Sequence, residues 1–222
     1  MKRVKIFLSL LLPWCLKRRL LNSIKGFEVS KEAYIGLSFV NPQILVLKPG
    51  SNIGHFNVII NLDKLVLNEN SSIGRSNWIT GFPTKSDSRH FAHDKGRESE
   101  LIIGKESAIT KNHHLDCTNA IHIGDFVTIA GYNSQLLTHS IDIYKGRQDS
   151  HPIMIGDYCF VSTDVNILGG SVLPAYSVLA AGAVLNKIYA EEWKLYGGVP
   201  AKPIKDISKD AKYFNRKIGF VY

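Results

Sequence analysis

Residues 155–190 read IGDYCF VSTDVN ILGGSV LPAYSV LAAGAV LNKIYA when they are written six at a time. The first position of the six hexapeptides is Ile, Val, Ile, Leu, Leu and Leu, and the fifth is a small or medium residue in five of them. An amphipathic helix repeats its apolar residues every three or four positions, and an ordinary half-buried strand repeats them every two. A period of six fits neither pattern and indicates a repeat architecture.

A solenoid with flat sides explains this period. Each hexapeptide forms one short strand and one corner, and three hexapeptides close one triangular coil. The first residue points inward and fills the core, while the fifth also points inward but has room only for a small side chain. Stacked coils then form three parallel sheets with strands about 4.8 Å apart. Ile-Gly pairs in the same phase recur upstream, at 35–36, 53–54, 73–74, 103–104 and 123–124.

The repeat also divides the chain. We expect an N-terminal segment at 1–30, a solenoid domain at 31–188 and a C-terminal tail with a short helix at 189–222. Polar stretches at 80–102 and 139–152 break the phase of the repeat. Solenoids accept insertions at their corners as external loops, and such loops often carry function.

The N-terminal segment differs in character from the rest. It begins MKRVKIFLSLLLPWCLKRRLL, with eleven mostly apolar residues at 6–16 between basic clusters. A spanning helix needs about 20 apolar residues, so this run is too short to cross a bilayer. Basic residues follow the run where a signal peptide would have a cleavage site. Two interpretations stay open: residues 1–20 contact an anionic membrane surface, or they form a helix that packs on the main domain or on a partner subunit.

Composition narrows the class of protein. The 222 residues are 45% hydrophobic and 21% charged, with a net charge of +8, which indicates a globular protein with an anionic partner. The basic residues are scattered or N-terminal and form no aromatic-basic motif, which argues against nucleic acid. Cys15, Cys117 and Cys159 have neither metal nor disulfide spacing. We therefore expect reduced thiols and a cytoplasmic location, with a peripheral position at the inner face of the membrane as an option.

Three stretches together resemble a known family: LLTHSID at 136–142, the repeat at 151–185, and YGGVPAKPI at 196–204. They resemble the hexapeptide-repeat acyltransferases, in particular galactoside and maltose O-acetyltransferases and the O-acetyltransferases of polysaccharide biosynthesis. The resemblance implies a left-handed parallel β-helix and a homotrimer with active sites between subunits. It also implies acetyl transfer from acetyl-CoA to a sugar hydroxyl, in surface-polysaccharide or lipid-linked glycan biosynthesis.

The same resemblance implies that His139 is the general base. A neutral imidazole can accept the proton of a sugar hydroxyl as that hydroxyl attacks a thioester, and can then protonate the leaving thiolate. Polar residues one coil earlier in the family contact the acceptor or the base, so Asn112, His114 and Asp116 are candidates for substrate binding. Asp142 is a further candidate, with a loop-capping role as its alternative. His113 falls at an inward fifth position, which favours a hydrogen-bonded core residue.

For acetyl-CoA, the resemblance points to small residues that let the pantetheine arm approach the backbone and to lysines that meet its phosphates. The matching positions are Ser162, Thr163, Ala180, Ala181, Gly182, Lys187 and Lys202. This chain departs from the family by reading CFVST where a Trp-Ile-Gly run is usual, which puts details of this wall in doubt.

No metal site is expected. His90, His93 and Asp94 have ligand-like spacing but lie in a polar loop and should face water. The histidine arrangement of the zinc-dependent carbonic anhydrases that share this solenoid is not reproduced after His139. Three alternatives to the O-acetyltransferase stay open: a non-catalytic scaffold subunit, an N-acetyltransferase that acts on an amino sugar, and a zinc-dependent hydratase, which a metal assay would settle.

Overall fold

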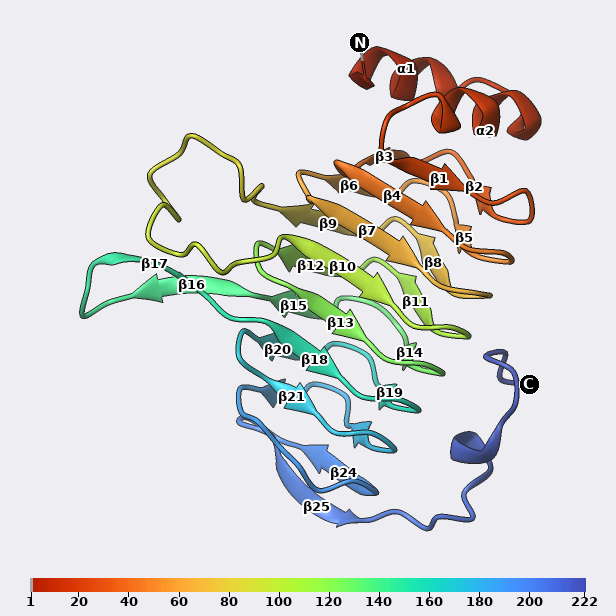
Figure 1. Cartoon of the computed structure of the whole chain (residues 1–222). Helices are drawn as coiled ribbons and strands as arrows, with labels where there is room; N and C mark the ends of the chain where they lie inside the picture. The colour runs from red at the N-terminus through yellow and green to blue at the C-terminus, as the bar shows by residue number, and fades with distance from the viewer. Residues whose placement is uncertain (1) are drawn as a thin grey trace.

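The six-residue period builds three parallel sheets along a left-handed β-helix, in a computed structural model that describes residues 2–222 (Figure 1). Sheet A contains β1 (Phe27–Val29), β4 (Ile44–Leu47), β7 (Lys64–Leu67), β10 (Glu100–Ile103), β13 (Ile121–Ile123), β18 (Ile153–Ile155) and β21 (Val172–Leu173). Sheet B contains β2 (Tyr34–Ile35), β5 (Asn52–Ile53), β8 (Ser72–Arg75), β11 (Ala108–Lys111), β14 (Thr128–Ile129), β19 (Phe160–Val161), β22 (Val178–Leu179), β24 (Lys194–Gly197) and β25 (Lys202–Asp206). Sheet C contains β3 (Phe39–Asn41), β6 (Val58–Ile60), β9 (Trp78–Gly81), β12 (His114–Cys117), β15 (Gln135–Leu137), β20 (Asn166–Leu168) and β23 (Val184–Leu185).

Strands of one sheet stack in register from coil to coil. Leu45 pairs with Leu65, Leu65 with Leu101, and Leu101 with Ile121. Each pair joins equivalent positions of consecutive coils, so like side chains form ladders that run along the solenoid. The predicted solenoid of hexapeptide repeats is therefore confirmed.

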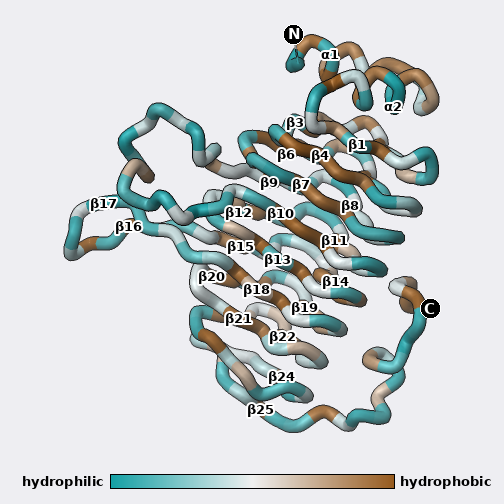
Figure 2. Tube along the Cα trace, viewed as in Figure 1, coloured by the Kyte–Doolittle hydropathy of each residue, from teal (hydrophilic) through white to brown (hydrophobic). Residues whose placement is uncertain are grey.

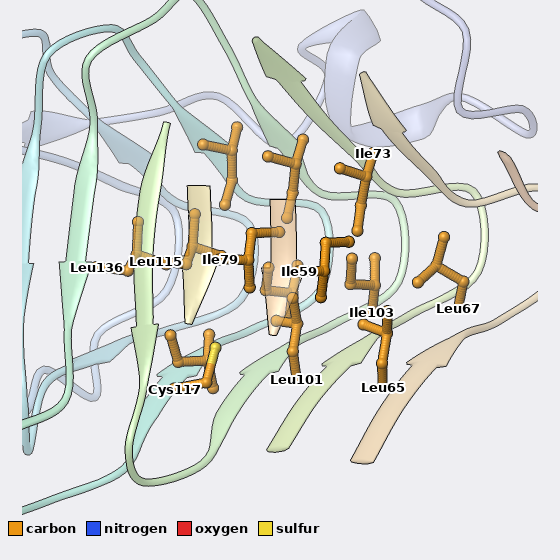
Figure 3. Packing of buried hydrophobic residues seen from close by; sticks show 14 of the residues in the cluster. Ile59, Leu65, Leu67, Ile73, Ile79, Leu101, Ile103, Leu115, Cys117 and Leu136 are labelled. Atoms are coloured by element: carbon orange, nitrogen blue, oxygen red, sulfur yellow. The ribbon is translucent and has the colours of Figure 1, made fainter. Parts of the chain in front are cut away.

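The ladders of branched aliphatic side chains fill the interior. Figure 3 shows Ile59, Ile79 and Leu115 from sheet C facing Leu65 and Leu101 from sheet A, and all five are at most 1% exposed. Burying one such side chain stabilises the fold by about 1.5–3 kcal/mol. The fifth positions also point inward and are fully buried, namely Cys159, Val165, Ser171, Ser177 and Ala183.

One corner of the solenoid carries a stack of aromatic rings. Phe126, Tyr158, Tyr176 and Trp193 occupy equivalent corner positions, each with a positive φ between 55° and 60°. Their successive ring centroids lie 4.6, 5.2 and 4.4 Å apart, with the rings nearly parallel. Stacking of the rings in consecutive coils accounts for bulky residues at positions with a left-handed backbone, where glycine or asparagine is usual.

The regular structure continues beyond residue 188. β24 adds to sheet B, and β25 turns back to pair with it in the antiparallel direction. The expected helix of the tail is a single 3₁₀ turn, η1 (Lys212–Asn215). Its Phe214 packs edge-on against Trp193 at 5.5 Å, so the tail covers the end of the aromatic stack.

Two short helices close the N-terminal end of the solenoid, α1 (Lys2–Ser9) and α2 (Trp14–Asn22) (Figure 1). Ile6 of α1 and Leu21 of α2 are buried in the core. The ammonium group of Lys17 donates a 2.6 Å hydrogen bond to the carbonyl oxygen of Gly36, and burial lowers the pKa of Lys17 to about 8. No helix in residues 2–222 combines the length and the hydropathy needed to span a bilayer.

Two insertions leave the solenoid on the same side (Figure 1). The first, residues 82–99, connects β9 to β10 without regular structure. The second is an antiparallel hairpin of β16 (His139–Asp142) and β17 (Arg147–Ser150). Both lie within the loops expected at 80–102 and 139–152, but the second has a regular structure that the polar sequence did not predict.

Candidate active site

His139 is the first residue of the hairpin, at the point where the chain leaves sheet C. The preceding residue, Thr138, is buried and fixes this exit. Its hydroxyl donates a 2.7 Å hydrogen bond to the carbonyl oxygen of Asp116, and its backbone N–H donates a 3.3 Å bond to the same oxygen. These two bonds to the preceding coil thus fix the backbone position from which the His139 side chain projects.

The carboxylate of Asp116 is the hydrogen-bond partner of His139. Asp116 lies on β12, one coil earlier, where it pairs with Leu137 of β15. Nδ1 of His139 donates to Oδ2 of Asp116. The other carboxylate oxygen accepts a 3.0 Å bond from the backbone N–H of Thr118 and a 2.7 Å bond from its hydroxyl. Because both oxygens are held, the carboxylate has a fixed orientation toward the imidazole.

The pair is electrostatically complementary. The hydrogen bond to Asp116 raises the pKa of His139, against the opposing effects of burial and of the Arg97 charge. Burial tends to raise the pKa of Asp116, but the hydrogen bonds from His139 and Thr118 outweigh it and hold that pKa below its ordinary value. With Nδ1 donating to the carboxylate, Nε2 of a neutral His139 carries a lone pair. The His139 side chain is 42% exposed, so this nitrogen can meet a substrate.

The first insertion supplies a wall beside the imidazole. The ring of Phe91 meets the ring of His139 edge-on at 6.0 Å. Arg97 stacks over Phe91 at 4.7 Å and donates hydrogen bonds to the carbonyl oxygens of Thr118 (2.5 Å), Pro83 (3.3 Å) and Phe82. Arg97 is therefore a clamp that joins residues 82–99 to the coil that carries Asp116.

The substrate-binding candidates fall in three places. His114 is exposed and projects from the same outer face of sheet C as Asp116, two residues earlier on β12. Asn112 lies at the corner before β12, with a φ of 54°, and so at the opposite edge of the sheet from His139. Asp142 accepts bonds from the backbone N–H groups of Tyr144 (3.0 Å) and Lys145 (3.1 Å), which makes it a cap of the hairpin turn.

His113 is a core residue, as its position in the repeat predicts. Its side chain is fully buried, with Nδ1 accepting from the backbone N–H of Ser134 (3.2 Å) and Nε2 bonded to the hydroxyl of Thr110 (2.9 Å). Burial lowers the pKa of His113 to about 4. This histidine is therefore neutral at physiological pH and has no access to a substrate.

The residues expected to bind acetyl-CoA divide between two edges of sheet C. Most of them lie at the corner between sheets B and C, or beside it: Ser162, Thr163, Ala180, Ala181, Gly182 and Lys202. His139 lies at the opposite edge. Gly169, which donates a 2.8 Å bond to the carbonyl oxygen of Leu137, marks that edge on the next coil. The strand β20 lies between Thr163 and Gly169 and spans roughly 10 Å of extended chain. Lys187 follows β23 on the edge of His139.

The ligand-like residues of the first insertion do not converge on a metal site. His90 and His93 are exposed, and Asp94 accepts a 2.8 Å hydrogen bond from the Ser150 hydroxyl. Within residues 2–222, no three His, Cys, Asp or Glu side chains are grouped as metal ligands.

Phe91, Arg97 and Thr118 were not predicted as site residues. Phe91 and Arg97 belong to a stretch without periodicity, so nothing in its sequence indicates which side chains turn back to the solenoid. Thr118 follows Asp116 by two residues, and this Asp-x-Thr spacing is a local signal that could have identified it, since a side chain two residues on can bond back to a carboxylate.

Comparisons with known proteins identify the fold. No family model matches the chain, and no curated protein matches its sequence. Among solved structures, the polysialic acid O-acetyltransferase OatWY superposes with a TM-score of 0.60, over 81% of this chain and 84% of that one, at 16% identity. The chain has the fold of the hexapeptide-repeat acetyltransferases.

Two further solved structures are similar at lower TM-scores. The polySia-specific acetyltransferase NeuO has a TM-score of 0.47 and 21% identity, over 84% of this chain and 85% of that one. A maltose O-acetyltransferase from Clostridium difficile 630 has a TM-score of 0.45 and 18% identity, over 92% of this chain and 83% of that one. At these identities the likeness concerns the fold, and the reaction has to be argued from the residues of this chain.

Proposed function

We propose that this protein is an acetyl-CoA-dependent O-acetyltransferase that acetylates a sugar hydroxyl in surface-polysaccharide or lipid-linked glycan biosynthesis. The observation that carries the proposal is the hydrogen bond between His139 and Asp116 at the edge of the solenoid. A general base needs an accessible lone pair and a fixed ring orientation, and this pair provides both.

In the proposed reaction, Nε2 of neutral His139 accepts the proton of the sugar hydroxyl as its oxygen attacks the thioester carbonyl of acetyl-CoA. The new C–O bond forms, the C–S bond breaks, and the imidazolium returns its proton to the departing thiolate. The products are the acetyl ester and free CoA, and His139 ends the cycle neutral. Asp116 acts as a positioning residue that holds the Nδ1 proton and stabilises the transient positive charge on the ring.

A homotrimer supports this chemistry better than a single chain. The small residues proposed for the pantetheine arm, Ser162, Thr163 and 180–182, lie across sheet C from His139 of the same chain. In a trimer, the corner of one subunit can face the His139 edge of its neighbour, so that acetyl-CoA lies in the groove between them. Lys187 and Lys202 are both exposed, as contacts with the CoA phosphates require.

The N-terminal helices support a peripheral contact with an anionic membrane from the cytoplasmic side. One face of α1 packs on the solenoid through Ile6, while Phe7 and Leu11 are 67% and 86% exposed. Figure 2 shows hydrophobic residues along both helices, at the end of the molecule farthest from β24 and β25. Basic side chains at Lys5, Arg18 and Arg19 accompany them, a combination typical of interfacial helices. A membrane position would suit an acceptor carried on a lipid.

The first test is calorimetric titration of the wild-type protein and of Lys202→Ala with acetyl-CoA and CoA. We expect about one site per chain and weaker binding by the variant. An acceptor screen then follows the release of the CoA thiol, with His139→Ala as the inactive control. If neither acetyl-CoA nor CoA binds at millimolar concentration, the O-acetyltransferase proposal fails and the non-catalytic scaffold is favoured. Acetylation of an amino sugar at nitrogen, but of no hydroxyl, would favour the N-acetyltransferase.

A further inference from the structure

The two insertions pack against each other beside His139. Nε2 of His93 bonds to the carbonyl oxygen of Gln148 at 2.9 Å, and the hydroxyl of Ser150 donates to Oδ2 of Asp94 at 2.8 Å. The Phe91 ring meets the His139 ring on the same side. Residues 82–99 therefore cover the face of the hairpin that carries His139, and Figure 1 shows the two insertions extending together from the solenoid.

A depression of about 280 Å³ lies between the insertions and is lined mainly by basic side chains. Arg89, His90 and His93 line it from residues 82–99, and Arg147 lines it from the hairpin. No Asp or Glu belongs to its lining. The two arginines come from segments far apart in sequence, so the cluster exists only because the insertions meet.

The arginines of this depression have no carboxylate partners of their own. Neither Arg89 nor Arg147 forms a salt bridge within residues 2–222, whereas Lys145 at the hairpin turn is paired with Asp142 at 3.0 Å. A guanidinium group presents its donors in a planar fork that matches a carboxylate or a phosphate. Asp142 lies opposite Arg147 across the hairpin, but its carboxylate is paired with Lys145. Both guanidinium groups are therefore free to pair with an anionic group.

Strand β16 links the depression to His139, the proposed base. Ile141 lines the depression and follows His139 by two residues on β16. Alternate residues of a strand share a face, and two residues span about 7 Å. Arg147 pairs with Asp142 and so begins on the other face of the hairpin, and it lines the depression beside Gly146 at the turn. An anionic group bound beside Ile141 would still lie near Nε2 of His139, close enough for both to contact one oligosaccharide.

Resting on the O-acetyltransferase function proposed above, we propose that the acceptor is an acidic glycan. A carboxylate or phosphate of the acceptor binds Arg89 and Arg147 in the depression, and this contact directs a nearby hydroxyl to His139. The basic depression is a specificity site for the acceptor and takes no part in the proton transfer. A neutral glycan of the same size lacks this contact and binds more weakly.

The test measures binding and turnover separately. An oligosaccharide that contains a carboxylate sugar is compared with its methyl ester and with a phosphorylated neutral analogue, by calorimetry and by acetyl transfer. The variants are Arg89→Gln and Arg147→Gln, with Lys85→Gln as the control. Lys85 is an exposed cation of the same insertion that does not line the depression.

We expect the wild type to bind the acid at least about tenfold more tightly than the ester. Either arginine variant should lose most of this difference, mainly as a higher KM, while Lys85→Gln keeps it. Tighter binding of the phosphorylated probe than of the carboxylate probe would identify phosphate as the group recognised.

Equal binding of acid and ester, unchanged in the arginine variants, would overturn the inference. Arginine-dependent binding of the acid without acetyl transfer to any acceptor would support the anion site and count against the proposed reaction. The two failures are therefore distinguishable.

Discussion

The imidazole of His139 donates a hydrogen bond to the carboxylate of Asp116, although 23 residues separate the two in sequence. The backbone of consecutive coils fixes this contact, because Asp116 pairs with Leu137 across sheet C and both hydrogen bonds that Thr138 donates end on the Asp116 carbonyl oxygen. The side chains of His139 and Asp116 are therefore held together by the backbone of two consecutive coils. This relationship makes the behaviour of the site with pH predictable.

Asp116→Asn should move the acid limb of the pH–rate profile to lower pH. The base form of His139 is lost as the pH falls through its pKa, which Asp116 raises above the ordinary value by hydrogen bonding and by charge. A neutral amide removes the charge, so the pKa of His139 falls and the limb follows it. The amide can also donate to Nδ1, which favours the tautomer with the proton on Nε2, so kcat should fall as well.

The measurement for Asp116→Asn is kcat across pH 5–9, beside His139→Ala and Asp87→Asn. We expect His139→Ala to lose about 10²–10⁴ of kcat, the usual worth of a general base. Asp87 is exposed in the first insertion and should leave the limb in place. If the acid limb of Asp116→Asn stays at the same pH or moves to higher pH, the carboxylate does not raise the pKa of His139.

Arg97→Met should move the same limb in the opposite direction. The positive charge of Arg97 lowers the pKa of His139, so its removal should raise that pKa and shift the limb to higher pH. Three carbonyl oxygens also lose a donor, which should lower the free energy of unfolding by about 1–3 kcal/mol.

Arg97→Lys separates the two effects, because lysine keeps the charge but cannot reproduce the forked hydrogen bonds. The limb should then stay close to that of the wild type while stability falls. Thermal unfolding and the pH profile of the two variants provide the comparison. If both variants shift the limb equally, the Arg97 clamp acts on His139 through geometry and not through charge.

The sequence predicts the solenoid well because every core position repeats. The six-residue period is evident from Ile155, Val161, Ile167 and Leu173. The equivalent residues upstream occupy the same ladders in the structure. The stacked residues Phe126, Tyr158, Tyr176 and Trp193 occupy equivalent corners of consecutive coils of unequal length, and an aromatic residue at a left-handed corner runs against local backbone preference. That stack is visible only once the coils are aligned.

The site is less predictable than the frame. His139 and Asp116 are both candidates from the sequence, but their contact depends on the register between coils of unequal length, which a count of residues does not establish. The hairpin carries polar and apolar residues on exposed faces, so its sequence shows no buried alternation. Phe91 and Arg97 return to the solenoid from an irregular segment, and only tertiary packing determines which of its side chains do so.

Gly169→Ala should displace the hairpin and lower kcat. A Cβ at this glycine would lie 2.6 Å from the carbonyl oxygen of Thr138 and 3.1 Å from that of His151. These backbone atoms flank the hairpin on both sides, so they must move and carry His139 with them. A displacement near 1 Å can cost about 10²-fold in rate.

Gly96→Ala is the matched control, since nothing lies within 4 Å of a Cβ there and its φ is not in the left-handed region. CoA affinity, kcat and thermal unfolding should be measured for both glycine variants. We expect a fall in kcat for Gly169→Ala alone, at a CoA affinity close to that of the wild type. Full activity in Gly169→Ala would mean that the hairpin tolerates displacement and that its position is not critical.

Phe7→Ser combined with Leu11→Ser should weaken binding to anionic vesicles without unfolding the protein. Phe7 is exposed on α1 and Leu11 is exposed in the turn that follows it, whereas Ile6 is 1% exposed and supports the core. Removing two apolar groups that enter the headgroup region should reduce the affinity for vesicles at least about tenfold. Phe220→Ser is the matched control, since Phe220 is 69% exposed but lies in the C-terminal tail.

Sedimentation with phosphatidylglycerol and phosphatidylcholine vesicles measures this effect at low and high salt. The neighbouring basic residues predict binding that requires the anionic lipid and weakens as salt rises. Ile6→Ala should instead lower the thermal stability, because it opens a cavity where α1 meets the solenoid. If the protein sediments equally with both lipids, or if the double variant binds vesicles as well as the wild type does, the exposed face of α1 contacts a protein partner rather than a membrane.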